Sequence, residues 1–225
     1  RVITRRVGYL VEQGTSPSNI LSITFTNKAA NEMKERLGEF LDLRGMWIST
    51  FHAMCSRILR SEIEHLEFTR NFSIYDSGDQ AKCIKDIMKE LKLDTDHWRP
   101  GAVAASISNA KNELLSAEEF AEYKSGYYND VVSKVYTKYQ KYLEANNALD
   151  FDDLLFKVVY LFKKFPEVLE KYQEKFRYIL IDEYQDTNHA QYAITQLLAQ
   201  RYENICATGD PDQSIYGWRG ANIRN

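Results

Sequence analysis

The stretch YILIDEYQDTN, residues 178–188, decides the fold class of this chain. Four apolar residues, Tyr178 to Ile181, run directly into two adjacent carboxylates, Asp182 and Glu183. A short apolar run bounded by polar residues is typical of a buried strand in a parallel sheet. Ligands of parallel α/β sheets bind outside the carboxyl ends of the strands. The two acids are therefore placed where a ligand would be.

Adjacent carboxylates at a strand end have two interpretations. One acid can hold Mg²⁺, which prefers few protein carboxylates together with waters and phosphate oxygens, while the other acts as a general base towards water. Alternatively, Asp182 and Glu183 merely begin a loop and favour the N-terminus of the next helix. The dipeptide alone leaves both interpretations open.

Short strands alternate with helices on both sides of this stretch. The predicted strands are 19–27, 46–50, 177–182 and 204–210, and the predicted helices beside them are 1–14, 28–40, 51–66 and 188–201. Thr26 or Asn27 can cap the helix at 28–40. This alternation predicts an α/β fold, a parallel sheet with helical crossovers.

The middle of the chain has a different pattern. Between residues 71 and 147 the sequence predicts helices and no strand, with Val132, Val135, Tyr139 and Tyr142 on one side of the last helix. After it, residues 149–166 read as a helix that ends at Pro166. The predicted organisation is a discontinuous α/β domain, residues 1–70 and 148–225, interrupted by an all-helical subdomain at residues 71–147.

Composition sets wide limits. The 225 residues are 44% hydrophobic and 27% charged, with a net charge of −3 and three widely spaced cysteines. No apolar run reaches the roughly 20 residues of a membrane span. The odd cysteine count and the absence of a CxxC spacing argue against a disulfide framework or zinc site, so a cytoplasmic location is the expectation.

A second polar stretch, TGDPDQSIYGWRGA at residues 208–221, also follows a short predicted strand. It contains Gln213, which can contact phosphate or water, and then Tyr216, Trp218 and Arg219 close together. Exposed rings beside an arginine suit single-stranded nucleic acid, because bases stack on the rings and cations follow the phosphates. The alternative is that the two rings belong to the core.

Two further strand ends carry polar residues and an aromatic ring. Phe25 is followed by Thr26 and Asn27, and the second strand end supplies Thr50 and His52. Hydroxyl groups and a helix N-terminus suit phosphate contacts. A single Phe at this position is more often a core residue, and a single His is more often a satisfied hydrogen-bonding group than a catalytic one.

These stretches, taken together and in order, resemble the motifs of the UvrD/Rep/PcrA family of superfamily 1 DNA helicases. The resemblance covers essentially the whole chain and rests on five segments: ILSITFTNKAANEMKERL, WISTFHAMCSRILR, LDFDDLL, ILIDEYQDTN and GDPDQSIYGWRGA. It implies a RecA-like P-loop NTPase core, ATP with Mg²⁺ as cofactors, and single-stranded DNA and single-strand/duplex junctions as partners.

The resemblance also implies roles on the nucleotide side. Asp182 would coordinate Mg²⁺, and Glu183 would be the general base for the attacking water. Gln185 would support the phosphate side, and Gln213 would sense the γ-phosphate. Phosphoryl transfer depends mainly on positioning and electrostatics, which agrees with this set of residues.

On the DNA side, the resemblance implies contacts from eight positions. They are Phe25, Thr26, Asn27, Thr50, His52, Tyr216, Trp218 and Arg219, of which Phe25, Tyr216 and Trp218 would stack on bases and Thr50 and His52 would touch the backbone.

One family motif is missing. The Walker A loop, GxxxxGK[ST], does not occur in these 225 residues, and RVITRRVGYL resembles the residues that follow that loop. We therefore expect the phosphate-binding lysine upstream of Arg1 and a second RecA-like domain beyond Asn225. We also expect these residues alone neither to hydrolyse ATP appreciably nor to unwind DNA.

Three functional readings compete. The first is a motor that hydrolyses ATP and moves along single-stranded DNA, with 3′→5′ polarity implied by the family. The second is a catalytically inactive module that binds single-stranded DNA, and Asp182 with Glu183 argues against it. The third is the helicase part of a recombination helicase-nuclease. The pathway, processivity, oligomeric state and protein partners do not follow from the sequence.

Overall fold

The computed structural model describes residues 2–210 and residue 212. Internal contacts divide the chain into two compact units, here named the sheet unit and the helical unit. The sheet unit is Arg1–Ile58 with Val158–Asn225, and the helical unit is Leu59–Lys157. The insertion predicted at residues 71–147 lies within the helical unit, and its exact ends stay a prediction.

The sheet unit contains four parallel strands in the order β2-β1-β5-β6, which confirms the α/β class with a parallel sheet. The strands are β1 (Ile20–Thr24), β2 (Trp47–Thr50), β5 (Tyr178–Ile181) and β6 (Ile205–Ala207). Ile23 is paired with Ile181, and Ile181 with Ala207. All four carboxyl ends therefore lie at one edge of the sheet.

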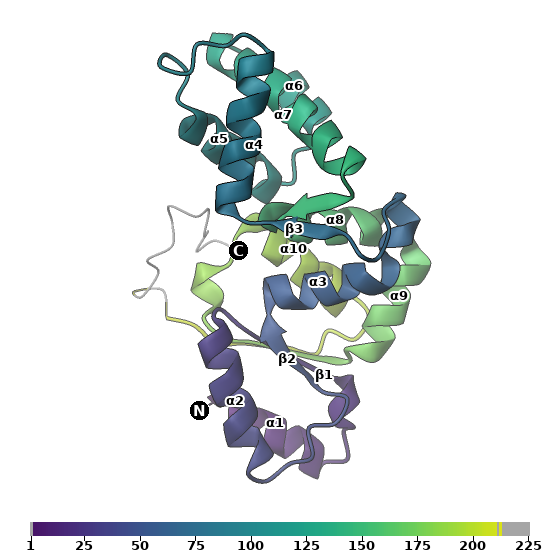
Figure 1. Cartoon of the computed structure of the whole chain (residues 1–225). Coiled ribbons are helices and arrows are strands. Elements are labelled where there is room, and N and C mark those ends of the chain that lie inside the picture. Colours follow the sequence, from purple (N-terminus) through teal and green to yellow (C-terminus); the bar gives the residue numbers. More distant parts are fainter. Residues whose placement is uncertain (1, 211, 213–225) are drawn as a thin grey trace. The chain divides into compact units, whose positions relative to one another are not determined.

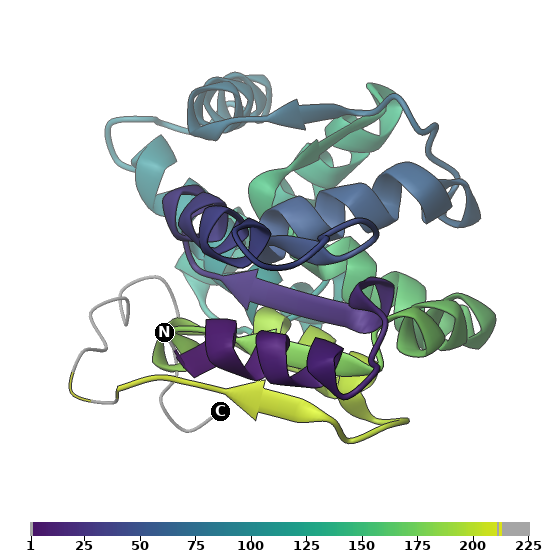
Figure 2. The same cartoon turned by 90° about the horizontal axis from the view of Figure 1, so that it is seen from below.

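Burial along the strands agrees with their order. Every residue of the central strand β1 is buried, and β5 is buried from Ile179 onward, as expected for strands covered on both faces. In β6, by contrast, Ile205 is 43% exposed and Cys206 is half-buried. The most apolar runs, β1 and β5, thus form the centre of the sheet, and β6 is one of the two outer strands among the four described ones (Figure 2).

Helices cover both faces of this sheet (Figure 1). They are α1 (Val2–Glu12), α2 (Asn27–Gly38), the start of α3 (Phe51–Glu62), the end of α8 (Phe151–Lys164), α9 (Pro166–Lys175) and α10 (His189–Ala199). Ile3 and Val7 of α1 share a core cluster with Leu37 of α2, Ile20 and Leu180. On the other face, Trp47 packs edge-on against Phe176, the residue that follows α9, at 5.0 Å.

The end of α8 confirms one sequence prediction and exposes an omission. The helix ends at Lys164, and Pro166 begins the separate helix α9, which the sequence analysis did not predict. Proline suits the first helical position because its missing N–H would be unpaired there in any case. Pro166 therefore both stops one helix and starts the next.

The sequence predicted an all-helical subdomain, but the helical unit also carries two short strands. Its helices are α4 (Ser77–Glu90), α5 (Pro100–Asn112), α6 (Ala117–Tyr123) and α7 (Tyr127–Ala145), and its strands are β3 (Ser73–Tyr75) and β4 (Ala148–Asp150). The two strands pair in parallel, with Ile74 opposite Leu149. Three residues are too few to show a period of two in the sequence.

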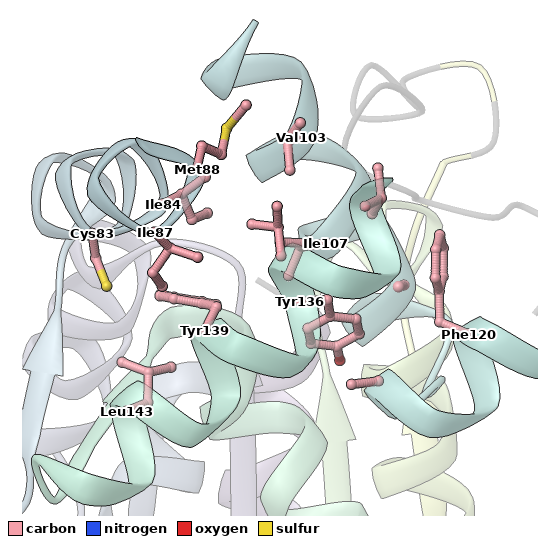
Figure 3. Close-up of a cluster of buried hydrophobic side chains, with 14 of the residues drawn as sticks. Cys83, Ile84, Ile87, Met88, Val103, Ile107, Phe120, Tyr136, Tyr139 and Leu143 are labelled. Carbon is pink, nitrogen blue, oxygen red and sulfur yellow. The ribbon is translucent and has the colours of Figure 1, made fainter. Parts of the chain in front are cut away.

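The core of the helical unit is formed by α4, α5, α6 and α7 (Figure 3). Val132, Val135 and Tyr139 of α7 are buried, as predicted, but Tyr142 is 43% exposed. Tyr136 is buried instead. At about 100° per residue, Tyr136 and Tyr142 lie about 60° from Tyr139 on opposite sides of the helix, so the helical period alone does not decide which of the two is buried.

A buried ionic cluster joins α5 to the start of α8. The ammonium group of Lys111, which is 0% exposed, lies 2.7 Å from Asp150 Oδ2 and 2.9 Å from Asp153 Oδ1. The hydroxyl of Tyr139 donates to the same Asp150 oxygen at 3.0 Å. Burial acts to lower the pKa of Lys111, but the two carboxylates outweigh it and hold that pKa above its ordinary value. The LDFDDLL segment is thus tied into the core of this unit.

The three cysteines are free thiols. Among residues 2–210 and 212, no helix has both the length and the apolar character required to cross a bilayer.

Candidate functional site

The two carboxylates of the opening stretch follow β5 at the carboxyl edge of the sheet. Asp182 is half-buried, and its backbone N–H donates to the carbonyl of Ile23 at 2.9 Å, one residue beyond the end of the strand. Glu183 is exposed. The sheet therefore fixes the backbone of Asp182 at the edge where parallel sheets bind ligands.

Thr208 holds the carboxylate of Asp182. Its hydroxyl donates to Asp182 Oδ1 at 2.7 Å, and its backbone N–H donates to the carbonyl of Ile181 at 2.8 Å. The sequence analysis assigned no role to Thr208. A signal was present, because Thr208 follows β6 as Asp182 follows β5, and these two strands are in register. Only the pairing of the strands turns that parallel position into a contact.

Glu183 adopts an uncommon backbone conformation. Its φ of 56° and ψ of 44° lie in the left-handed region, which disfavours residues with a side chain. Such outliers concentrate at functional sites, where surrounding contacts hold them in place. Here the amide nitrogen of Gln185 donates to Glu183 Oε2 at 2.6 Å. The turn after β5 therefore places the Glu183 carboxylate in a defined direction.

Gln185 also contacts the loop after β6. Its side-chain oxygen accepts a hydrogen bond from the backbone N–H of Asp210 at 3.1 Å. A side-chain carbon on Gly209 would clash with that same oxygen and would lie 3.2 Å from the backbone nitrogens of Tyr184 and Gln185. Glycine at position 209 thus allows the two loops to approach each other closely.

Phe25, Thr26 and Asn27 follow β1 at the same edge. Phe25 is half-buried, and Asn27 is exposed at the start of α2. Thr26 caps this helix, because its hydroxyl oxygen accepts from the backbone N–H of Ala29 at 3.1 Å. The choice between Thr26 and Asn27 as the cap is therefore settled in favour of Thr26.

Thr50 and His52 lie at the end of β2, where α3 begins without a loop. The Thr50 hydroxyl oxygen accepts from the backbone N–H of Ala53 at 3.3 Å, and His52 is half-buried. Thr50 is in register with Thr24 of β1. Three neighbouring strands, β2, β1 and β5, thus bring the residues predicted for DNA and for nucleotide to one edge of the sheet.

Four predicted site residues, Gln213, Tyr216, Trp218 and Arg219, lie outside the described residues. Their roles stay predictions. In the sequence they follow Thr208, Gly209 and Asp210.

The electrostatics of the edge fit a cation bound together with phosphate. Within the described part of the chain, no lysine or arginine forms an ion pair with Asp182 or Glu183. The same residues contain no group of three or more His, Cys, Asp and Glu side chains that could cage a metal by themselves. Mg²⁺ bound to phosphates needs only one or two protein carboxylates, and the carboxylate of Asp182, oriented by a neutral hydroxyl, has the chemistry of such a ligand.

The parallel α/β fold and the acids at this edge agree with a P-loop NTPase core, and comparison with known proteins identifies the family. The chain matches the UvrD/REP helicase N-terminal domain over residues 1–225 and belongs to that family. It is 54% identical over its whole length to the ATP-dependent DNA helicase PcrA of Bacillus subtilis (strain 168) and 49% identical to that of Staphylococcus aureus (strain Mu50). PcrA of Staphylococcus epidermidis is also 49% identical. The chain covers 31% of the length of each relative.

Proposed function

We propose that this chain is the N-terminal ATPase portion of an ATP-dependent DNA helicase that moves 3′→5′ along single-stranded DNA. The observation that carries the proposal is the pair Asp182 and Glu183, held by Thr208 and Gln185 at the carboxyl edge of a parallel sheet. Family membership and the similarity to PcrA support it. We also propose a cytoplasmic location, which the similarity to the bacterial PcrA helicases supports.

On the nucleotide side, Asp182 would hold Mg²⁺ bound to ATP. The bound ion would neutralise charge on the phosphates during transfer. Asp182 is suited to this role because the Thr208 hydroxyl directs its Oδ1 while leaving its negative charge unpaired among the described residues. Gln213, outside the described residues, would sense the γ-phosphate.

Glu183 would act as the general base. It would accept a proton from the water that attacks the γ-phosphate, and its exposed carboxylate stands beside the proposed metal ligand. The contact from Gln185 keeps one carboxylate oxygen directed, and so links Gln185 to the phosphate side. Geometry of this kind supports catalysis by positioning.

On the DNA side, Phe25 would stack on a base, and Thr26, Asn27, Thr50 and His52 would contact the strand. They are grouped at the edge that also carries the proposed nucleotide site. Tyr216, Trp218 and Arg219 would extend this platform. The motor would work at junctions between single-stranded and duplex DNA, and residues 1–225 alone would lack turnover because the phosphate-binding loop is not among them.

The test is ATP hydrolysis by the full-length protein with and without single-stranded DNA, in wild type and Glu183→Gln. We expect DNA to stimulate wild type, and the variant to lose about 10²–10⁴ in turnover, the usual contribution of a general base. Nucleotide binding should change little.

Glu203→Gln is the matched control. Glu203 lies in the same unit, is exposed, and also has a left-handed backbone, with φ of 54°. It should keep wild-type turnover. A wild-type protein that binds single-stranded DNA without DNA-stimulated hydrolysis would instead favour the inactive binding module.

A further inference from the structure

The side chain of Gln185 bridges two loops, a contact that its place in the sequence motif does not predict. Its side chain is buried, 6% exposed, between the loop after β5 and the loop after β6. The amide nitrogen donates to Glu183 Oε2 at 2.6 Å, and the amide oxygen accepts from the Asp210 N–H at 3.1 Å. A single side chain thus joins the proposed base to the neighbouring loop.

The backbone around this contact is built for close approach. The N–H of Tyr184 donates to the carbonyl of Thr208 at 2.9 Å, so the main chains of the two loops already run together. Gly209 has no side chain at the point where one would strike the Gln185 amide oxygen. A shift of the 208–210 segment would therefore move the acceptor side of Gln185 directly.

The chemistry of the side chain is specific to glutamine. A carboxylate such as Glu183 requires a donor, and a backbone N–H requires an acceptor; a primary amide supplies both. Glutamate has the same length but offers no donor when ionised, and methionine offers neither group in useful strength. Because the Gln185 amide is neutral, it directs the Glu183 carboxylate without cancelling its charge.

Glu183 needs such an external constraint. Its left-handed backbone is unfavourable for a residue with a side chain, so its orientation depends on contacts around it. In the sequence, the residues proposed to bind DNA, Tyr216, Trp218 and Arg219, follow the 208–210 segment that Gln185 touches.

We propose that Gln185 is a positioning residue that makes the orientation of the Glu183 carboxylate depend on the 208–210 segment, and thereby couples ATP hydrolysis to bound single-stranded DNA. This inference rests on the proposed function. Gln185 acts through Glu183 and transfers no proton itself.

The experiment compares the full-length wild type with Gln185→Glu and Gln185→Met. ATP turnover is measured across pH 5.5–9 with and without an oligodeoxythymidine of roughly 20 nucleotides. Both variants should reduce DNA-stimulated turnover about 10- to 100-fold, so that the ratio of stimulated to basal rate falls towards one. The KM for ATP should stay within about threefold of wild type.

The pH profile separates positioning from general loss of structure. In Gln185→Glu a second carboxylate stands beside Glu183, so the acidic limb of the turnover profile should move to higher pH. Gln185→Met adds no charge and should leave that limb in place. Gln173→Glu is the matched control, because Gln173 is equally buried at 6% exposed and donates to the Leu197 carbonyl at 2.8 Å in the same unit. It should keep both the stimulation ratio and the pH profile.

Two results would overturn the inference. Wild-type stimulation in both Gln185 variants, while Glu183→Gln is inactive, would remove the coupling role and leave the proposed function intact. Equal losses in Gln185→Glu and Gln173→Glu, with matching falls in melting temperature, would assign Gln185 a purely structural role. Failure of the proposed function would look different, because wild type itself would then show no stimulation by DNA.

Discussion

Both units place closely spaced carboxylates at the end of a short strand, but the surroundings of these carboxylates differ. In the sheet unit, Asp182 and Glu183 accept hydrogen bonds from a hydroxyl and an amide, both neutral. In the helical unit, Asp150, the last residue of β4, and Asp153 in α8 both pair with the buried ammonium group of Lys111.

This difference separates an acidic motif that can bind a cation from one that cannot. Neutral donors orient a carboxylate and leave its charge available to a cation, whereas a buried lysine neutralises that charge and fills the space. Asp150 and Asp153 are 2% and 0% exposed in their side chains, so no ligand reaches them. The DE and DFDD segments look alike in sequence, but only the first stands at an open sheet edge.

The contrast between the two acidic segments requires that Lys111 stabilise the folded protein. Replacing Lys111 with methionine leaves Asp150 and Asp153 buried without their cation, and removal of one partner from a buried ion pair costs about 3–5 kcal/mol. We expect the free energy of unfolding in urea, followed by circular dichroism, to fall by that amount. Lys85→Met, at an exposed position of α4, should change it by no more than about 0.5 kcal/mol. Equal stability of the two variants would contradict a structural role for the cluster.

In the sheet unit, the role of the neutral donor is tested at Thr208. Thr208→Val keeps the shape of the side chain and removes the hydroxyl that directs Asp182. Loss of a hydrogen bond to a metal-binding carboxylate typically costs 10- to 100-fold in metal affinity or activity. The Mg²⁺ concentration that half-saturates ATP turnover should rise by about that factor in the full-length protein. Thr208→Ser keeps the hydroxyl and should stay near wild type; an unchanged requirement in Thr208→Val would show that Asp182 needs no such support.

The smallest expected effect concerns Asp152. Of the three acids in the LDFDDLL segment, it is the one that does not pair with Lys111. Burial, together with the charge of Asp150, raises the pKa of Asp152 to about 6. The folded state then binds this proton more tightly than the unfolded state, so the ionised carboxylate lowers stability above pH 6, and this cost disappears as pH falls towards 4.

Asp152→Asn should therefore be more stable than wild type at pH 8, by about 1 kcal/mol, and equal to it near pH 4. Asparagine can still accept the hydrogen bond from Asn112, which is 3.1 Å from Asp152 Oδ1. Urea unfolding at the two pH values measures the difference, with the exposed Glu122→Gln as control. A less stable Asp152→Asn at pH 8 would mean that the carboxylate contributes more through its contacts than it loses by burial.

The sheet, and the edge that carries the proposed site, could be predicted from the amino-acid sequence alone. Continuous apolar runs such as Tyr178–Ile181 are set by burial on both faces, and alternation with helices dictates parallel pairing. Polar residues directly after those runs, from Phe25–Asn27 to Asp182 and Glu183, must then lie at one edge. Local side-chain chemistry also predicted that Thr26 or Asn27 caps the helix after β1, and that a helix ends at Pro166.

Tertiary structure decided which neighbours those residues meet. The contacts of Thr208 with Asp182 and of Asp210 with Gln185 join residues more than twenty positions apart, and no local pattern encodes them. The pairing of β3 with β4 and the burial of Tyr136 in place of Tyr142 likewise depend on how distant elements pack. Hydrophobic periodicity reports which face of an element is buried, but the partner of a polar side chain is set only once the chain has folded. For this reason the sequence predicts the two acids, and the fold alone shows what holds them in place.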